Sequence, residues 1–161
     1  MNLWNKKIIA GMALIAVTLA SGIILIAVSQ ATYPLVVQDA WTSSDAGGPP
    51  QTEFPVGSLV FLNEELFYPE TYYGDGAATI NFLYAVTISD PNNTPVIVSV
   101  GAGFIDPGQI VVVSAGGSIP FGSMTGTYTA SGMVMNGFPS QMGPDWELYA
   151  EPVDVTFTVT S

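Results

Sequence analysis

Both basic residues of the chain precede a long apolar run, and all of its acidic residues follow that run. Lys6 and Lys7 are the only lysines or arginines, histidine is absent, and no charge interrupts residues 8–28. The 13 acidic residues lie between Asp39 and Asp154, so the net charge of −11 divides into +2 before the run and −13 after it. This asymmetry predicts a membrane segment with a cytoplasmic N-terminus, followed by an exported domain.

The apolar run is long enough to cross a bilayer. At about 1.5 Å per residue, residues 8–28 reach roughly 30 Å as a helix. They form either a permanent transmembrane helix or a signal peptide, in which Ser29 and Ala31 supply the small residues of a peptidase site. The length favours retention and the Ser-x-Ala sequence favours cleavage. We therefore expect residues 1–31 to be a membrane helix or signal segment, and residues 32–161 to be an extracellular domain.

A third interpretation of the apolar run is that of a type IV pilin, which keeps its apolar helix after processing and uses it as a filament core. Processing in such proteins places a basic residue and a Gly or Ala immediately before the cut. Here Lys7 is followed by Ile8, and Gly11 comes only after two further residues. The run also lacks an early glutamate, so the match is incomplete.

The exported part contains no lysine, arginine, histidine or cysteine. Without cations it offers nothing to bind phosphate, which excludes a nucleic-acid partner. Zinc, haem and copper sites need His or Cys, and Ser-His-Asp or Cys-His catalysis is excluded for the same reason. We therefore predict a non-enzymatic protein without a resident cofactor. The expected partners are the membrane and other surface proteins or copies of itself.

The missing bases also suggest adaptation to acid. Near pH 2–3 most carboxylates are protonated, so a domain without bases carries almost no charge. Repulsion among cations, which drives most acid unfolding, is then absent. We expect such a domain to stay folded at low pH.

Period-two alternation is the main pattern after residue 32. The even positions of residues 79–88 are apolar, and so are the odd positions of residues 153–160, whose other positions are acidic or threonine. Both segments are typical of antiparallel strands with one buried face and one wet face. Other expected strands are shorter or less regular: residues 35–41, 59–62, 96–100, 110–113 and 128–135.

The segments between these strands are rich in turn residues. We expect turns at residues 46–50, 90–93, 106–108 and 116–117. About seven strands at this spacing, with no helical pattern beyond the apolar run, predict one all-β domain in the form of an antiparallel β-sandwich.

Five segments in a characteristic order carry a family resemblance: residues 37–41 (VQDAW), 52–61 (TEFPVGSLVF), 88–96 (ISDPNNTPV), 126–129 (GTYT) and 155–159 (VTFTV). In this order the chain resembles the immunoglobulin-like (CARDB and related Ig-like) modules of prokaryotic, especially archaeal, cell-surface proteins. The resemblance covers most of residues 35–160. It implies an immunoglobulin-like sandwich with a surface role, and it implies no catalytic residues.

Within that resemblance, Tyr128 matches a tyrosine corner, whose hydroxyl bonds back to the backbone near the start of its strand. Ala130 stands where the second cysteine of the usual pair would be. Trp41 and Trp146 are further expected structural residues.

Several aspartates lie at or near the expected turns: Asp39, Asp45, Asp90, Asp106 and Asp145. Because no base can pair with them, a cluster could hold Ca²⁺ through carboxylate and carbonyl oxygens. The spacing matches no EF-hand. The other interpretation is that Asp-Pro and similar pairs simply form turns, and we favour it.

An aromatic and acidic loop, YPETYYGDG, spans residues 68–76. Its tyrosines Tyr68, Tyr72 and Tyr73 form either an exposed patch that stacks on sugars or proteins, or a cover over one end of the sandwich. A second candidate surface is residues 138–149, which contain Trp146. Its apolar residues either pack under a long loop or form a subunit contact.

Two short motifs complete the candidate residues. Asn92 begins the only N-x-S/T sequon, in an expected turn outside the membrane, so we predict its glycosylation, with lower efficiency because Pro95 follows the motif. Glu64 and Glu65 could suggest paired acids for glycoside chemistry. Adjacent strand residues point to opposite faces, however, so we expect that the two carboxyl groups do not converge.

These observations leave three functions open. The first, which we favour, is a membrane-anchored surface protein that presents one Ig-like domain in a structural or adhesive role. The second is a subunit of an extracellular pilus or filament, built through the apolar helix or by adding residues 32–41 as a strand to a neighbour. The third is an accessory subunit of a membrane complex. Accordingly we expect the chain at the cell membrane with its domain outside, or at the cell surface after cleavage.

Overall fold

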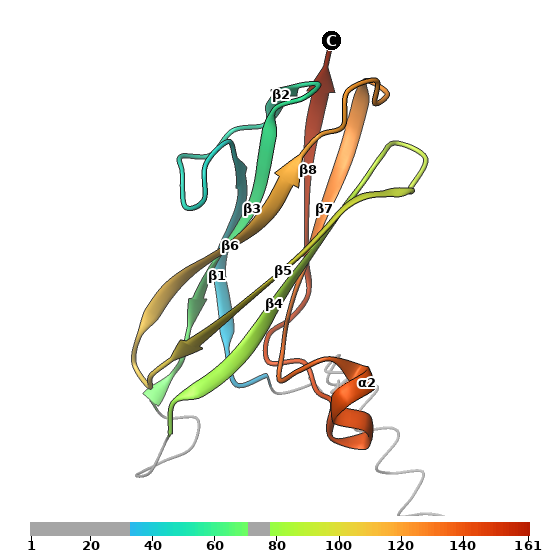
Figure 1. Cartoon of the computed structure of the whole chain (residues 1–161). Coiled ribbons are helices and arrows are strands. Elements are labelled where there is room, and N and C mark those ends of the chain that lie inside the picture. The colour runs from blue at the N-terminus through green and yellow to red at the C-terminus, as the bar shows by residue number, and fades with distance from the viewer. Residues whose placement is uncertain (1–32, 71–77) are drawn as a thin grey trace, which may run out of the picture. The chain divides into compact units, whose positions relative to one another are not determined.

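Two β-sheets pack face to face in the computed structural model, which describes residues 33–70 and 78–161 (Figure 1). In that part of the chain, one sheet has three strands and the other five. The three-stranded sheet has the order β1 (Val36–Ser43), β3 (Leu59–Phe67), β6 (Ile110–Ser118). The five-stranded sheet has the order β2 (Glu53–Pro55), β8 (Val153–Thr160), β7 (Gly126–Met135), β4 (Ile80–Ser89), β5 (Pro95–Ile105). The predicted all-β sandwich is confirmed.

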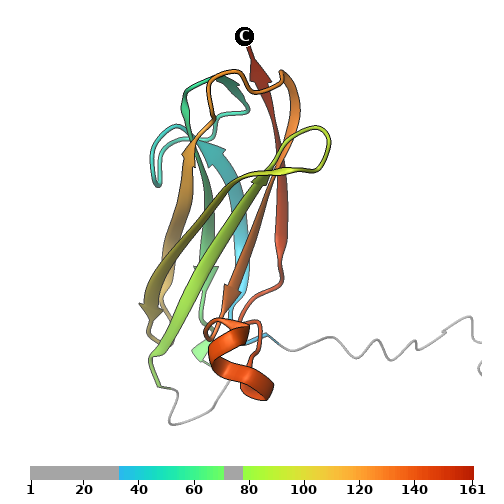
Figure 2. The same ribbon diagram turned by 45° about the vertical axis from the view of Figure 1, so that its right-hand side comes forward.

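Neighbouring strands run antiparallel, except that the short strand β2 lies parallel to β8. Figure 2 shows β1, β3 and β6 together on one side and β7 and β8 together on the other. Residues 33–161 form one compact unit. Residues 1–31, the predicted membrane or signal segment, lie outside the described residues. Among the helices of the described part, none has the length and apolar character needed to cross a membrane.

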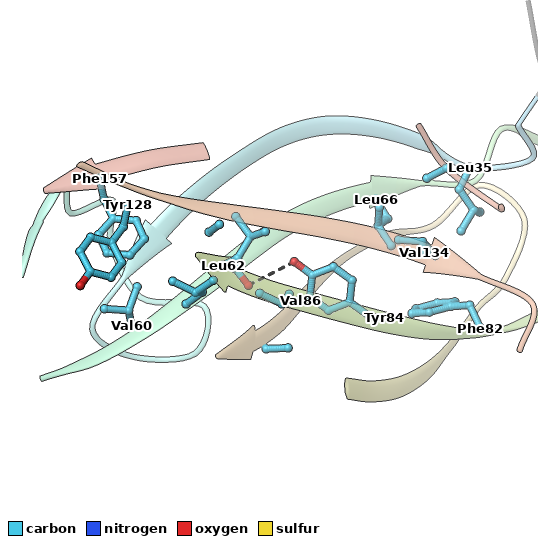
Figure 3. Packing of buried hydrophobic residues seen from close by; sticks show 14 of the residues in the cluster. Leu35, Val60, Leu62, Leu66, Phe82, Tyr84, Val86, Tyr128, Val134 and Phe157 are labelled. Atoms are coloured by element: carbon cyan, nitrogen blue, oxygen red, sulfur yellow. Dashed lines mark hydrogen bonds between the residues drawn. The ribbon is translucent and has the colours of Figure 1, made fainter. Parts of the chain in front are cut away.

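The alternation predicted for β4 and β8 sets the core. Phe82, Tyr84, Val86 and Ile88 are buried along β4. The odd positions of β8 point inward and end in Phe157 and Val159, while the even positions between 154 and 158 are exposed. Figure 3 shows these inward rows meeting the β3 row between the sheets. The predicted faces of both strands are therefore confirmed.

Three of the four expected turns fold as turns. In the first, Gly48 donates its backbone N–H to the carbonyl of Asp45 over 2.9 Å. Asn93 donates its backbone N–H to the carbonyl of Asp90 over 2.8 Å and has a φ of 62°. Gln109 donates likewise to Asp106, and Gly108 supplies a φ of 79°. Left-handed backbone of this kind suits Gly and Asn, which is why these residue types stand there.

The expected turn at residues 116–117 is wrong, because both glycines lie inside β6. The backbone of Gly116 passes so close to β3 that an added Cβ would collide with the carbonyl of Val60 and with Phe61. The glycine therefore permits a close approach between two strands and does not mark a reversal of the chain.

Two expected strands are longer in the structure, and two further segments contain elements that were not expected. β3 continues past the two glutamates to Phe67, and β5 continues past Gly101 and Gly103 to Ile105. The three-residue strand β2 was not expected, since it is short and ends in Pro55. Residues 138–149 contain two short helical segments, α2 (Pro139–Met142) and η2 (Gly143–Asp145), where no helix was expected. They lie at the end of the sandwich opposite the C-terminus (Figure 1).

Candidate functional site

The outward face of β5 carries an unbroken apolar row. Along this strand the even positions point away from the core, and Val98, Val100, Ala102 and Phe104 are all exposed. Val98 is 70% exposed and Phe104 63%. A half-buried strand normally presents polar side chains on such a face, as β8 does here. The outward row of β5 is thus more apolar than the stability of an isolated domain requires.

Neighbouring strands extend this row into a patch. In the ladder between β4 and β5, Val100 pairs with Ala85 and Ala102 pairs with Leu83. Ala85 pairs on its other side with Met133 of β7, which is 38% exposed. We call the whole set the apolar stripe: Val98, Val100, Ala102 and Phe104 of β5, Leu83 and Ala85 of β4, and Met133 of β7.

The local sequence explains why β5 is built this way. On its inward side β5 carries Gly101 and Gly103, and a Cβ added to Gly103 would lie 2.8 Å from the ring of Phe82. The small inward residues leave room for the large core side chains of β4, so the bulky residues of β5 are on the outside. β4 is the only described strand that pairs with β5, which ends the five-stranded sheet.

No charged residue occurs in β4, β5 or β7. The other exposed surfaces of the described residues contain carboxylates: Asp39 and Glu65 on the three-stranded sheet, Asp154 on β8, and the acidic residues of the loops at both ends. Outside these strands, the exposed Val112 pairs with Glu65, and Phe121, which is 89% exposed, lies in the loop after β6. The apolar stripe is therefore a charge-free area on an acidic domain.

Among the residues that the structure describes, one carboxyl group is buried in the core, and the sequence did not predict its burial. Glu64 is 1% exposed and lies in the inward row of β3 with Val60, Leu62 and Leu66. Burial raises the pKa of Glu64 to about 7, and the neighbouring Tyr84 hydroxyl opposes part of that change. Its Oε1 atom has no hydrogen-bond partner. The continuing alternation Val-x-Leu-x-Glu-x-Leu was the signal that could have revealed it.

Facing groups confine the Glu64 carboxyl. Tyr84 of β4 donates its hydroxyl to the carbonyl of Leu62 over 3.3 Å, as Figure 3 shows. Burial, followed by the nearby Glu64 charge, raises the pKa of Tyr84. A Cβ added to Gly132 of β7 would collide with Glu64 Oε1. The group is enclosed by the core, and Glu65 lies on the other face of the strand, as expected, so the two do not form a catalytic pair.

A polar cluster on the outer face of β3 holds a loop in place. Asn63 is fully buried, and its Oδ1 accepts hydrogen bonds from the backbone of Gly47 and from the hydroxyl of Ser114. Its Nδ2 donates to Ser43 over 2.7 Å. Trp41, an expected structural residue, donates its Nε1 to the carbonyl of Gly48 over 2.8 Å. These bonds fix residues 44–50 against the sheet.

The expected calcium ligands are not brought together. Among the described residues, no three acidic groups gather closely enough to hold a metal ion. Asp90 accepts backbone hydrogen bonds from Asn92 and Thr94, both over 2.9 Å, and Asp106 accepts a hydrogen bond from the Thr79 hydroxyl. The Asp90 carboxylate thus serves as a turn former, whereas Asp106 closes its turn through its backbone carbonyl and uses its carboxylate to hold Thr79.

The remaining aspartates of that set also have local contacts. Asp39 accepts a hydrogen bond from the backbone of Ala40 over 2.8 Å. The Asp45 backbone carbonyl accepts from Ser43, and the Asp145 carbonyl accepts from Asn136. They lie on separate elements: β1, the loop after β1, and η2.

The two candidate interaction loops have different outcomes. Tyr68 is 1% exposed, which favours the alternative that it covers one end of the sandwich. Tyr72 and Tyr73 lie outside the described residues. Trp146 is half-buried, and its Nε1 is enclosed with no acceptor among the described residues. Trp146 is followed by residues that return to the sheet through a bridge between Leu148 and Met135.

The hydrogen bond expected from the Tyr128 hydroxyl to nearby backbone is present. Tyr128 is fully buried near the start of β7, and its hydroxyl donates to the carbonyl of Met124 over 2.8 Å. Its ring packs beside Phe157 with a centroid distance of 5.7 Å. Ala130 is also fully buried. Asn92 is exposed in its turn, so its side chain is accessible, and its glycosylation stays a prediction.

No protein-family model matches the chain, and no curated protein matches it in sequence. Solved structures do resemble it in fold. The C-terminal domain of wzt superposes with a TM-score of 0.55 and 12% sequence identity, over 81% of this chain and 75% of that one.

Two other solved structures resemble the chain more weakly. They are an alkylpurine DNA glycosylase of Pseudomonas fluorescens (TM-score 0.47, 12% identity, 81% of this chain and 32% of that one) and a beta-glucuronidase of glycoside hydrolase family 2 (0.49, 12%, 80% and 13%). The likeness to the wzt domain shows a β-sandwich fold, and it shows nothing of an activity.

Proposed function

We propose that the chain is a non-enzymatic surface protein, anchored by residues 1–31, that presents one immunoglobulin-like β-sandwich outside the membrane. The observation that carries the proposal is the apolar stripe. A charge-free apolar patch on the outer face of a sheet is typical of a protein-binding surface.

The strand order supports the immunoglobulin-like assignment. One sheet contains the first, third and sixth strands, and the other joins β8, β7, β4 and β5. Consecutive strands cross repeatedly between the two layers, as in immunoglobulin domains. The buried Tyr128 hydroxyl bonds to the backbone four residues upstream, which is the usual geometry of the tyrosine corner.

The charge distribution supports the location. The +2 end precedes residues 8–28 and the −13 part follows them. Such a distribution keeps residues 1–7 inside and delivers the sandwich outside.

Cysteine labelling tests this arrangement directly, because the natural chain has no cysteine. We would introduce Thr156→Cys at an exposed outward position of β8, and Asn5→Cys before the apolar run. On intact cells a membrane-impermeant maleimide should label Thr156→Cys, and it should label Asn5→Cys only after lysis. Protection of Thr156→Cys in intact cells would exclude an exported domain. If residue 5 were missing from the mature chain, residues 1–31 would be a cleaved signal peptide and not an anchor.

A further inference from the structure

We propose that the apolar stripe is the contact surface for a second copy of this chain. The proposal deepens the proposed function, on which it rests, by naming the partner of the exported domain. It starts from the four outward residues of β5, which are exposed at consecutive outward positions of one strand.

Electrostatics favours a copy over a partner of another kind. A cationic protein would be drawn to the acidic faces of the domain, where the carboxylates lie, and not to the charge-free stripe. An anionic lipid surface would be repelled, because the exported part has no base. A second copy presents an equally uncharged stripe, so the two can approach without placing carboxylates against each other.

The other faces of the domain cannot make the same contact. Glu65 and Asp39 lie opposite each other on the three-stranded sheet, and Asp154 of β8, paired with Ser131 of β7, lies beside the stripe on the outward face of the five-stranded sheet. With no lysine, arginine or histidine after residue 7, no ion pair could offset like charges between copies. Contacts between copies through the three-stranded sheet or over β8 would therefore be opposed at neutral pH, whereas a contact centred on β4 and β5 brings together strands that contain no charged residue.

The geometry suits an isologous contact, in which both copies use the same patch. Outward side chains of a sheet can interdigitate with those of a facing sheet at a separation of about 10 Å. Val98 to Phe104 extends roughly 20 Å along the strand, and β5 to β7 extends roughly 10 Å across. This is smaller than the ~800 Å² per partner of stable soluble complexes, so the contact is a weak one.

Anchoring compensates for the small area. Copies held on one membrane have a high effective concentration, so a weak contact between their domains becomes populated without a large interface. The stripe is thus suited to lateral association of copies at the cell surface.

The experiment uses the full-length chain in its native membrane. Ala102→Cys places one thiol at an exposed position inside the stripe, and Thr156→Cys places one at an exposed position on the acidic and threonine-rich part of the same sheet face. A short bismaleimide should join two copies through Ala102→Cys and not through Thr156→Cys. Adding Val98→Thr and Phe104→Thr to Ala102→Cys should lower the dimer yield about tenfold or more, as for a loss of contact free energy in a small interface.

The outcomes distinguish a failure of the contact between copies from a failure of the proposed function. Labelling of Ala102→Cys from outside without a dimer would overturn the contact between copies and leave the proposed function intact. So would equal crosslinking at both positions, crosslinking that survives the two threonine substitutions, or a product containing a different protein. Failure of the maleimide to reach Thr156→Cys on intact cells would instead overturn the proposed function. As a second, milder variant, Val98→Thr alone keeps a β-branched side chain of the same shape and guards against misfolding.

Discussion

Two strand faces of the domain depart from the usual division of apolar inside and polar outside, and they do so in opposite senses. The inward row of β3 places Glu64 among buried aliphatic residues. The outward row of β5 places apolar side chains in solvent, with Val98 70% exposed. The buried carboxyl of Glu64 lowers the stability of the folded state at neutral pH. The exposed side chains of β5 contribute no free energy of apolar burial to an isolated domain.

The comparison separates the residues that build the fold from those on which our proposals rest. β4 and β8 follow the alternation rule and explain why the sandwich forms. β3 and β5 break it, and we propose that each break adds a property that a stable sandwich does not need: a response of stability to pH, and a contact surface. The four predictions below test that separation, beginning with the largest expected effect.

Glu64 should make the domain more stable as the medium becomes acidic. Above pH 7 its carboxyl is charged in both states, so the folded state bears the full cost of burial. Below pH 4.5 it is neutral in both, and the cost is absent. A pKa raised from 4.5 to about 7 corresponds to about 3 kcal/mol, so the free energy of unfolding should rise by that amount between pH 7.5 and 4.5. Chemical denaturation across this range measures it.

The matched control lies on the same strand. Glu64→Gln should remove most of the pH dependence, whereas Glu65→Gln, on the outer face, should keep it. Unfolding of the natural chain between pH 7 and pH 2.5 would contradict both this account and the acid adaptation expected from its missing bases.

Gly132→Ala should destabilise the domain by about 2 kcal/mol, since its methyl group enters a filled core. The methyl would collide with Glu64 Oε1 and lie 2.9 Å from Leu62 Cδ2. If the crowding acts through Glu64, then Glu64→Ala should relieve much of the cost. A double-mutant cycle measured by thermal unfolding at pH 4.5 checks this, and additive effects would count against the contact.

Tyr128→Phe should lower the free energy of unfolding by about 1 kcal/mol. The substitution keeps the ring beside Phe157 and removes only the hydrogen bond to Met124. Tyr33→Phe, near the start of the described residues and half-buried, serves as a control for the loss of a tyrosine hydroxyl. An unchanged midpoint for Tyr128→Phe in urea would show that the corner adds no stability here.

Substitutions in the apolar stripe should have the smallest effect on folding. Val98→Thr and Phe104→Thr alter exposed side chains, so the free energy of unfolding should change by less than about 0.5 kcal/mol. Association between copies should weaken strongly at the same time. Substitutions that unfolded the domain would instead show that β5 needs these side chains for its own stability.

The sequence predicts the parts of the fold that follow a simple rule. Alternation located the faces of β4 and β8, and Asp-Pro pairs located two turns. It failed at Gly116, because a glycine inside a strand and a glycine in a turn look alike until the neighbouring backbone is known.

The apolar stripe could not be predicted from the sequence for a related reason. In residues 96–100 every position except Ser99 is apolar, so no periodicity shows which side is covered. The two glycines that follow hid the second half of β5. The alternation placed Glu64 and Glu65 on opposite faces, but it did not show that Glu64 faces the core, where the buried row continues to Leu66.

The most direct test of the apolar stripe is energy transfer between copies of the full-length chain in liposomes. Donor and acceptor dyes would be attached to Thr156→Cys, outside the stripe, and the protein diluted with lipid in steps. We predict transfer well above that of randomly distributed chains, and a fall to the random level when Val98→Thr and Phe104→Thr are added. Energy transfer at the random level in the chain with the natural stripe would contradict the account. Energy transfer that the two substitutions leave unchanged would also contradict it.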